Sequence, residues 1–393
     1  MKNYKTILTL GCVCLVSIAA GCDIQIGDWG QAKYDRTVQR QAPLPAGSTL
    51  VAKTSLGFVT ITGADVTDCS VVAEISGRAP TEAEAQELAE QVEITLETVG
   101  NTMTVKADKP TTKHNRSISI SYTITVPRQT RIECASSYGA VKISEINANV
   151  RGNSSSGSIA AENIQGSTNL DTSYGSVKCR NISGEELSVK SSSGSITAEN
   201  VKGSVRLNTS YGSITCRDLS DGDFELRSSS GSIRLSNAAF GVCDVHTSYG
   251  SIDADELKGD SIKLHSDSGG IHVTGASADA VDVSTSYGRI TGREITTGNL
   301  TAKSGSGSLD VDCSQGAPAG LVASLETSYG NIDFTTPPGF AGQVDLSTSY
   351  GSIRTSRPIT VSGEMSKKQL KGTIGEGSGK LHLQTSSGSI NLN

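Results

Sequence analysis

Four polar side chains stand where a repeated motif of the chain is interrupted, and their types could support acid–base chemistry. They are His265, Asp267, His272 and Arg289. Imidazole and carboxylate groups are those that general acid–base catalysis uses, and a β-helical scaffold could place such a cluster against a polysaccharide. Substituted outer positions of a repeat protein are, however, normally solvated surface. We therefore interpret these four residues as surface residues and keep polysaccharide cleavage as an alternative.

Other motifs for catalysis or cofactor binding were not found in the sequence. Despite the abundance of serine and glycine, no serine stands in a G-x-S-x-G turn, and "GEGSGK" at 375–380 lacks the spacing of a phosphate loop. Cation binding by Asp253, Asp255, Asp310 and Asp312 has little support, because the glycine-rich nonapeptide that would support it is missing. The histidines are scattered and no C-x-x-C pair occurs. We predict that the protein is not an enzyme and that it binds no cofactor and no metal.

A cysteine near the N-terminus predicts a lipid anchor. Lys2 and Lys5 precede an apolar run over residues 7–20, which ends at Gly21 and Cys22. This run is too short for a membrane span, and "SIAAGC" resembles the lipobox of bacterial lipoproteins. An ordinary secretory signal is the alternative, because the box departs from its commonest form. We expect residues 1–21 to be a signal peptide and Cys22 to carry lipid. The chain would then be exported and lipid-anchored to the bacterial cell envelope, on its periplasmic or surface face.

Six further cysteines do not predict a disulfide framework. They are Cys69, Cys134, Cys179, Cys216, Cys243 and Cys313. Cys179 and Cys216 occupy the same repeat position, four residues after a glycine, where other copies carry aliphatic residues. Two coils apart, their Cα atoms would be about 9.6 Å distant, beyond the reach of a disulfide. We expect small buried apolar residues here.

The length of the repeat is given by the spacing of its glycines, which recur every 18 or 19 residues. They are Gly139, Gly157, Gly175, Gly194, Gly212, Gly231, Gly250, Gly269, Gly288 and Gly307, with longer steps to Gly330, Gly351 and Gly388. Two residues after each glycine the side chain is branched and apolar, and upstream positions alternate apolar and polar. This pattern predicts an all-β parallel β-helix, a solenoid with 18–19-residue coils and a ladder of aliphatic residues inside.

A tyrosine precedes the glycine in every other copy, and a serine precedes it in the rest. The tyrosines are Tyr138, Tyr174, Tyr211, Tyr249, Tyr287, Tyr329 and Tyr350, and only the last two follow each other directly. One interpretation is packing, in which a large corner ring covers a neighbouring coil. The other is an exposed aromatic ladder that binds sugars or a partner surface. We expect partly exposed rings with a mainly structural role and keep the binding ladder as a hypothesis.

The region before the repeats has a different pattern. Residues 22–47 resemble a tether, and residues 48–131 predict a small β-rich region. "PTEAEAQELAEQV" predicts a helix near 81–91 with Thr81 as its N-cap, followed by a hairpin that turns at Gly100 and Asn101. Residues 132–393 are assigned to the solenoid.

Charge and composition limit the partners. The formal net charge is −6 and aromatic residues make up only 4%. No basic stripe is present, so we expect no nucleic-acid binding. The core must be built from aliphatic residues.

Several segments together are similar to a known family. They are "TSLGFVTITG", "TEAEAQELAEQVEITLE", "SYTITVPRQTRIECASSYGAV" and "GTIGEGSGKLHLQTSSGSINL", which span most of residues 48–393. Their order resembles the bacterial β-strand-repeat family labelled putative adhesin, a domain of unknown function, here in lipoprotein form. The resemblance implies a β-helical fold outside the cytoplasm and carries no catalytic site.

Three functions follow from these observations. The first is a non-catalytic, membrane-tethered module for adhesion or envelope interactions, with a glycan or an envelope protein as partner. The second is a self-associating envelope scaffold, because stacked strands leave open edges unless capped. The third is the polysaccharide-active enzyme considered above.

Overall fold

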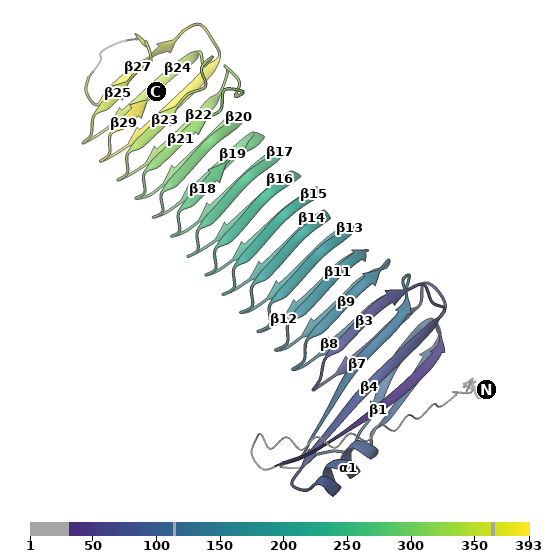
Figure 1. The fold of residues 1–393 in the computed structure, drawn as a ribbon. Helices are drawn as coiled ribbons and strands as arrows, with labels where there is room; N and C mark the ends of the chain where they lie inside the picture. Colours follow the sequence, from purple (N-terminus) through teal and green to yellow (C-terminus); the bar gives the residue numbers. More distant parts are fainter. Residues whose placement is uncertain (1–30, 113–114, 363–365) are drawn as a thin grey trace, which may run out of the picture. The chain divides into compact units, whose positions relative to one another are not determined.

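The computed structural model describes residues 31–112, 115–362 and 366–393, and the chain divides into two compact units, residues 1–172 and 173–393. Cys22 and the expected signal peptide lie outside the described residues. Within them the fold is β throughout except for one helix, which confirms the predicted fold class (Figure 1). No helix of this part of the chain is long and apolar enough to cross a membrane.

The first unit consists of two runs of paired strands and a helix. One run is β1 (Ala32–Pro43), β4 (Asp68–Ala79), β7 (Ser117–Pro127), β3 (Val59–Ala64), β9 (Val141–Ile146) and β11 (Ile159–Gln165). The other is β5 (Glu93–Val99), β6 (Thr102–Asp108), β2 (Thr49–Thr54), β8 (Arg131–Ser136), β10 (Val150–Ser154) and β12 (Thr168–Thr172). The antiparallel pairs β1–β4, β4–β7 and β5–β6 lie at the start of the two runs, and the predicted hairpin at Gly100 and Asn101 joins β5 to β6.

The helix prediction is confirmed by α1 (Glu82–Glu90), whose first turn is capped by Thr81. The Glu84 N–H donates to Thr81 Oγ1 at 3.3 Å. Ala85, Leu88 and Ala89 form the buried face of the helix.

The expected tether over residues 22–47 is corrected over residues 32–43, which form strand β1, whereas residues 22–30 lie outside the described part of the chain. Residues 32–43 pair with β4 along the whole strand, and Arg36 donates to the Ala89 and Glu90 carbonyls at the end of α1. Val38 is the one buried side chain of this strand, so its sequence has the polarity of a linker. Backbone pairing and a capping arginine hold β1 where apolar patterning is too weak to predict it.

The second unit is a stack of parallel coils (Figure 1). Its long strands are β13 (Val177–Ser191), β14 (Ile196–Thr209), β15 (Ile214–Ser228), β16 (Ile233–Thr247), β17 (Ile252–Ser266) and β20 (Ile290–Ser304). Another coil divides into β18 (Ile271–Thr274) and β19 (Ser277–Thr285). Neighbouring coils pair in register, as Ile196 with Ile214 and Ile214 with Ile233. This register buries the predicted aliphatic ladder except at Ile353, which is half-buried.

Each long strand bends at a left-handed residue that lies six positions after the corner glycine. The φ angles are 51–56° at Asn181, Asn200, Asp218, Asn237, Glu256 and Glu294. Asparagine and aspartate tolerate this conformation better than most residues, and their side chains bond along the stack. Asn200 Nδ2, for example, donates to Asn181 Oδ1 at 2.8 Å. This second corner was not predicted from the sequence, although the Asn and Asp column is visible in the repeat.

The last coils do not stack in chain order. The remaining strands are β21 (Leu309–Cys313), β22 (Val322–Thr327), β23 (Ile332–Thr335), β24 (Gly342–Thr348), β25 (Ile353–Thr355), β26 (Thr360–Val361), β27 (Gln369–Ile374), β28 (Gly379–Thr385) and β29 (Ile390–Leu392). The C-terminal strands β28 and β29 lie between the β22–β23 coil and the β24–β25 coil. β27 covers the other edge of β24 in antiparallel orientation.

Candidate functional site

The repeated "TSYGS" and "SSSGS" segments form one corner of every coil, and a buried hydroxyl holds that corner. The Gly212 N–H donates to Thr209 Oγ1 at 3.2 Å, and Thr209 Oγ1 donates to the Gly194 carbonyl of the preceding coil at 3.1 Å. The same pair of bonds recurs at Ser228, Thr247, Ser266, Thr285, Ser304, Thr327, Thr348 and Thr385. Only serine or threonine can supply both bonds at this position.

The corner needs glycine because neighbouring coils approach too closely for a side chain. A Cβ on Gly212 would lie 2.1 Å from the Gly194 carbonyl oxygen, and one on Gly231 would lie 1.9 Å from that of Gly212. Such contacts with backbone atoms cannot be relieved by moving a side chain. The glycine column is therefore a packing requirement of the stack.

The tyrosine side chains at this corner point into solvent. Strand alternation by itself would place Tyr211 inside, but the corner turns its ring outward and leaves 71% of the residue exposed. The exposed fractions in the second unit are 70–72% for Tyr174, Tyr211, Tyr249, Tyr287 and Tyr329, and 82% for Tyr350. Tyr138 of the first unit is 69% exposed. The backbone beneath each ring is held by the stack, as the Tyr211 N–H donates to the Ser192 carbonyl at 3.0 Å.

Tyrosine and serine alternate in space even where the chain order breaks. Tyr329 and Tyr350 are consecutive tyrosines in the sequence, but the coil that carries Ser387 lies between them. The Ser387 N–H and the Tyr350 N–H each make a 2.9 Å bond, to Ser328 and Ser386 respectively. From Tyr174 to Tyr350, every second coil of the second unit carries a ring.

We define the tyrosine strip as the four corner residues of each coil in the second unit, from two before the glycine to one after it. Asp267 and Arg289 are the only charged residues at these positions. Asp267 is held by His265, whose Nε2 lies 3.1 Å from its Oδ1. This bond, with a smaller contribution from the Ser248 hydroxyl, keeps the pKa of the Asp267 carboxyl below its usual value.

The candidate acid–base residues come together only in part. His265 Nδ1 lies 2.9 Å from Ser284 Oγ, so Ser284, His265 and Asp267 form a chain with the connectivity of a hydrolytic triad. However, Ser284 lies inside β19, which pairs on both sides with β17 and β20. The backbone N–H groups around Ser284 lie within these ladders and are not free to form an oxyanion hole. His272 pairs with Thr274 instead, and Arg289 is exposed.

The aspartates considered for cation binding are mostly neutralised by arginine. Arg293 binds Asp310 at 2.6 Å and Asp312 at 3.2 Å, and Arg234 lies 3.4 Å from Asp253. Asp255 is exposed. Among the described residues, no group of three His, Cys, Asp or Glu side chains could hold a metal ion.

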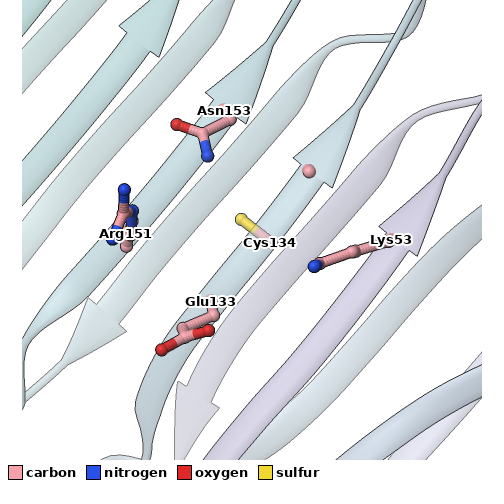
Figure 2. Close-up of a pocket in the computed structure, with 6 residues that line it drawn as sticks. Lys53, Glu133, Cys134, Arg151 and Asn153 are labelled. Atoms are coloured by element: carbon pink, nitrogen blue, oxygen red, sulfur yellow. The ribbon is translucent and has the colours of Figure 1, made fainter.

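A shallow depression of about 290 Å³ lies on the first unit, over β2, β8 and β10 (Figure 2). It is lined by Lys53, Glu133, Cys134, Ala135, Arg151 and Asn153. Ala135 stands in register with Lys53 and Asn153. Because the alanine side chain is shorter than those of its two neighbours, it leaves the depression between them. Burial raises the pKa of the Cys134 thiol to about 12, so it stays protonated and unreactive. The sequence interpretation did not single out this place.

The six cysteines are buried and free, as expected. Cys179 and Cys216 are two coils apart, each in register with Ala198 of the coil between them. Burial raises the pKa of Cys179 to about 12.

Comparison with known proteins places the chain in a family. A solved structure described as a putative adhesin from Bacteroides fragilis is 14% identical, with a TM-score of 0.22, covering 91% of this chain and 97% of that one. A putative cell adhesion protein from Clostridium sporogenes is 9% identical, with a TM-score of 0.15, covering 91% and 99%. No curated protein matches the sequence. The Toastrack DUF4097 profile matches residues 57–241 and 218–393, so the chain belongs to the Toastrack DUF4097 family.

Proposed function

We propose that this protein is a non-catalytic module of the bacterial cell envelope, tethered by lipid at Cys22, that binds a partner through the tyrosine strip. The observation that carries the proposal is the spatial alternation of exposed rings. A packing role would cover most of each ring, whereas about 70% of each residue is exposed in five successive cases. Large aromatic side chains held on a rigid backbone are typical of contact surfaces.

The rest of the molecule supports a scaffold for this strip. Corner hydroxyls, the glycine column and the aliphatic ladder fix the backbone of every coil, so the rings stand on a preorganised surface. The Ser284–His265–Asp267 chain lacks the donors that acyl transfer needs, which favours a binding role over catalysis. Each ring adds a weak contact, and contacts along one strip add up through avidity.

Self-association from strand edges is less well supported at the C-terminal end of the second unit. β27 covers the free edge of β24, and β26 is only two residues long. Covered and short edge strands prevent pairing with another chain.

The test is binding to isolated cell envelopes by the full mature chain in detergent. We expect replacement of Tyr211, Tyr249 and Tyr287 with serine to weaken binding by about tenfold or more. Serine already stands at this position in alternate coils, so the fold should be kept, and this is checked by the melting temperature. The matched phenylalanine variant keeps the rings and should bind. Unchanged binding by the folded serine variant would refute the proposed function.

A further inference from the structure

The tyrosine strip repeats with a regular spacing along the second unit. Neighbouring coils of a parallel stack lie about 4.8 Å apart, so successive rings are separated by about 9.6 Å. Five rings have nearly the same exposure, and the alternation is kept where the chain order breaks, at Ser387. A surface with one repeated unit fits a partner that also repeats. A globular protein would instead meet an irregular patch.

The space between two rings is lined by hydroxyl groups. Between Tyr211 and Tyr249, the intervening coil presents Ser229, Ser230 and Ser232. Ser251 Oγ lies 3.2 Å from Ser232 Oγ, so hydroxyls of neighbouring coils are within hydrogen-bonding distance of each other. Hydroxyls donate and accept, and an aromatic face covers apolar C–H groups. The combination suits a sugar ring, which has C–H faces and a hydroxyl edge.

Charge decides which class of polymer fits. On the sheet face next to the strip, Arg206 and Arg227 both bind Glu225, and Arg227 also binds Asp244. The only charged residues of the tyrosine strip itself are Asp267 and Arg289. A polyanion would find no cationic row to replace its counterions, so an uncharged chain is favoured.

We infer that the tyrosine strip takes an extended, uncharged, β-linked polysaccharide, with one disaccharide for every two coils. Two extended β-1,4-linked pyranose units have a length close to the ring spacing. Alternate sugar rings stack on tyrosine faces, and the sugars between them bond to the serine hydroxyls of the intervening coils. This inference rests on the proposed function, since it names the partner of the same strip.

The test uses chitohexaose and cellohexaose as uncharged β-1,4-linked probes, titrated calorimetrically into the full mature chain in detergent. Chitobiose is the length control, maltohexaose the α-linked control and carboxymethyl cellulose, which is anionic and β-1,4-linked, the charged control. We expect a β-linked hexamer to bind at least about tenfold more tightly than the dimer, because it reaches successive rings. The Tyr211, Tyr249 and Tyr287 triple serine variant should lose about tenfold in affinity, and the triple phenylalanine variant should bind within about threefold of the natural chain.

The outcomes separate this inference from the proposed function. The polysaccharide inference is overturned if neither β-linked hexamer binds, or if the hexamer and the dimer bind with the same affinity. It is also overturned if the folded triple serine variant binds the hexamer as tightly as the natural chain does. If the serine variant nevertheless loses binding to cell envelopes, the proposed function stands with another partner. Light scattering tests whether the tyrosine strip instead binds a second copy of the chain. If the natural chain is a dimer and the triple serine variant is a monomer, the strip is a self-association surface and the polysaccharide inference is overturned.

Discussion

Tyr329 and Tyr350 lie two coils apart, with Ser387 in the coil between them, although 37 residues separate Tyr350 from Ser387 along the chain. A Cβ on Gly388 would lie 1.8 Å from the Gly330 carbonyl oxygen, and one on Gly351 would lie 1.9 Å from that of Gly388. The C-terminal coil therefore fits between two coils that precede it in sequence. The large–small alternation therefore follows position in the stack and not order in the chain.

The inserted coil makes the C-terminus part of the core. Ile390 is fully buried although it is close to the end of the chain, where residues usually fray. We expect Ile390→Ala to lower the free energy of unfolding by about 2–4 kcal/mol, since the ladder closes on it from both sides. Lys380→Ala, at an exposed position of the same coil, should have little effect. Similar urea midpoints for the two variants would contradict the insertion.

Glycine at the corner should be irreplaceable within the stack. In Gly212→Ala the new methyl group meets the Gly194 carbonyl oxygen at 2.1 Å, so the coils must separate locally. We expect a loss of at least about 2 kcal/mol in chemical denaturation. Gly298 is a matched control in the same unit, because a Cβ there meets nothing closer than 3.7 Å. If Gly298→Ala cost as much as Gly212→Ala, close approach of the coils would not be the cause.

The corner hydroxyl should matter more than the size of its side chain. Thr209→Val keeps the shape but leaves the Gly212 N–H and the Gly194 carbonyl without their partner in a buried place. The expected cost is about 1–3 kcal/mol. Thr209→Ser keeps both bonds and should cost less, as serine does the same task at Ser228. Equal destabilisation by valine and serine would show that the methyl group is the important part.

Much of the solenoid could be predicted because its signals repeat. The 18–19-residue glycine period, the aliphatic ladder and the buried Cys179 and Cys216 all follow from equivalent positions of the repeat stacking on one another. The cap at Thr81 could also be predicted, since capping is a local preference. These features depend on short-range rules applied at every coil.

Other features depend on contacts that no local pattern shows. β1 is polar because only Val38 faces the core, so its pairing with β4 could not be distinguished from a tether. The place of β28 between β22 and β24 is a long-range choice among coils that all carry the same motif. The exposure of the rings in the tyrosine strip could not be predicted, because strand alternation favours an inward Tyr211 and the glycine corner favours an outward one. The Ser284–His265 contact needed the register of two coils.

The lipid anchor is tested at Cys22, the acceptor expected from the sequence. Thioether attachment needs the cysteine sulfur, so Cys22→Ser should abolish both fatty-acid labelling and signal cleavage. Metabolic labelling followed by detergent phase partitioning measures both. Cys12→Ser, within the expected signal peptide, is the control and should be labelled normally. Continued labelling of the Cys22→Ser chain would rule out this residue as the anchor.

Acid should weaken the second unit through His246, whose ring stacks on that of His265. The rings of His246 and His265 are parallel within 11° with centroids 4.9 Å apart. Burial, then the neighbouring His265, lowers the pKa of His246 below its ordinary 6.5, with Arg227 acting in the same direction and Asp244 and Asp267 opposing it. A lowered pKa means that the unfolded chain binds the proton more tightly. This contribution to stability is therefore complete above about pH 6.5 and is lost as the pH falls from there through the folded pKa. The lowered pKa of Asp267 adds a second loss of stability at more acidic pH, below about 3.8.

We expect the urea midpoint to fall between pH 7.5 and pH 5, and His246→Asn to reduce that fall while His272→Asn does not. An unchanged pH dependence in the His246→Asn chain would exclude His246 as the acid-sensitive group.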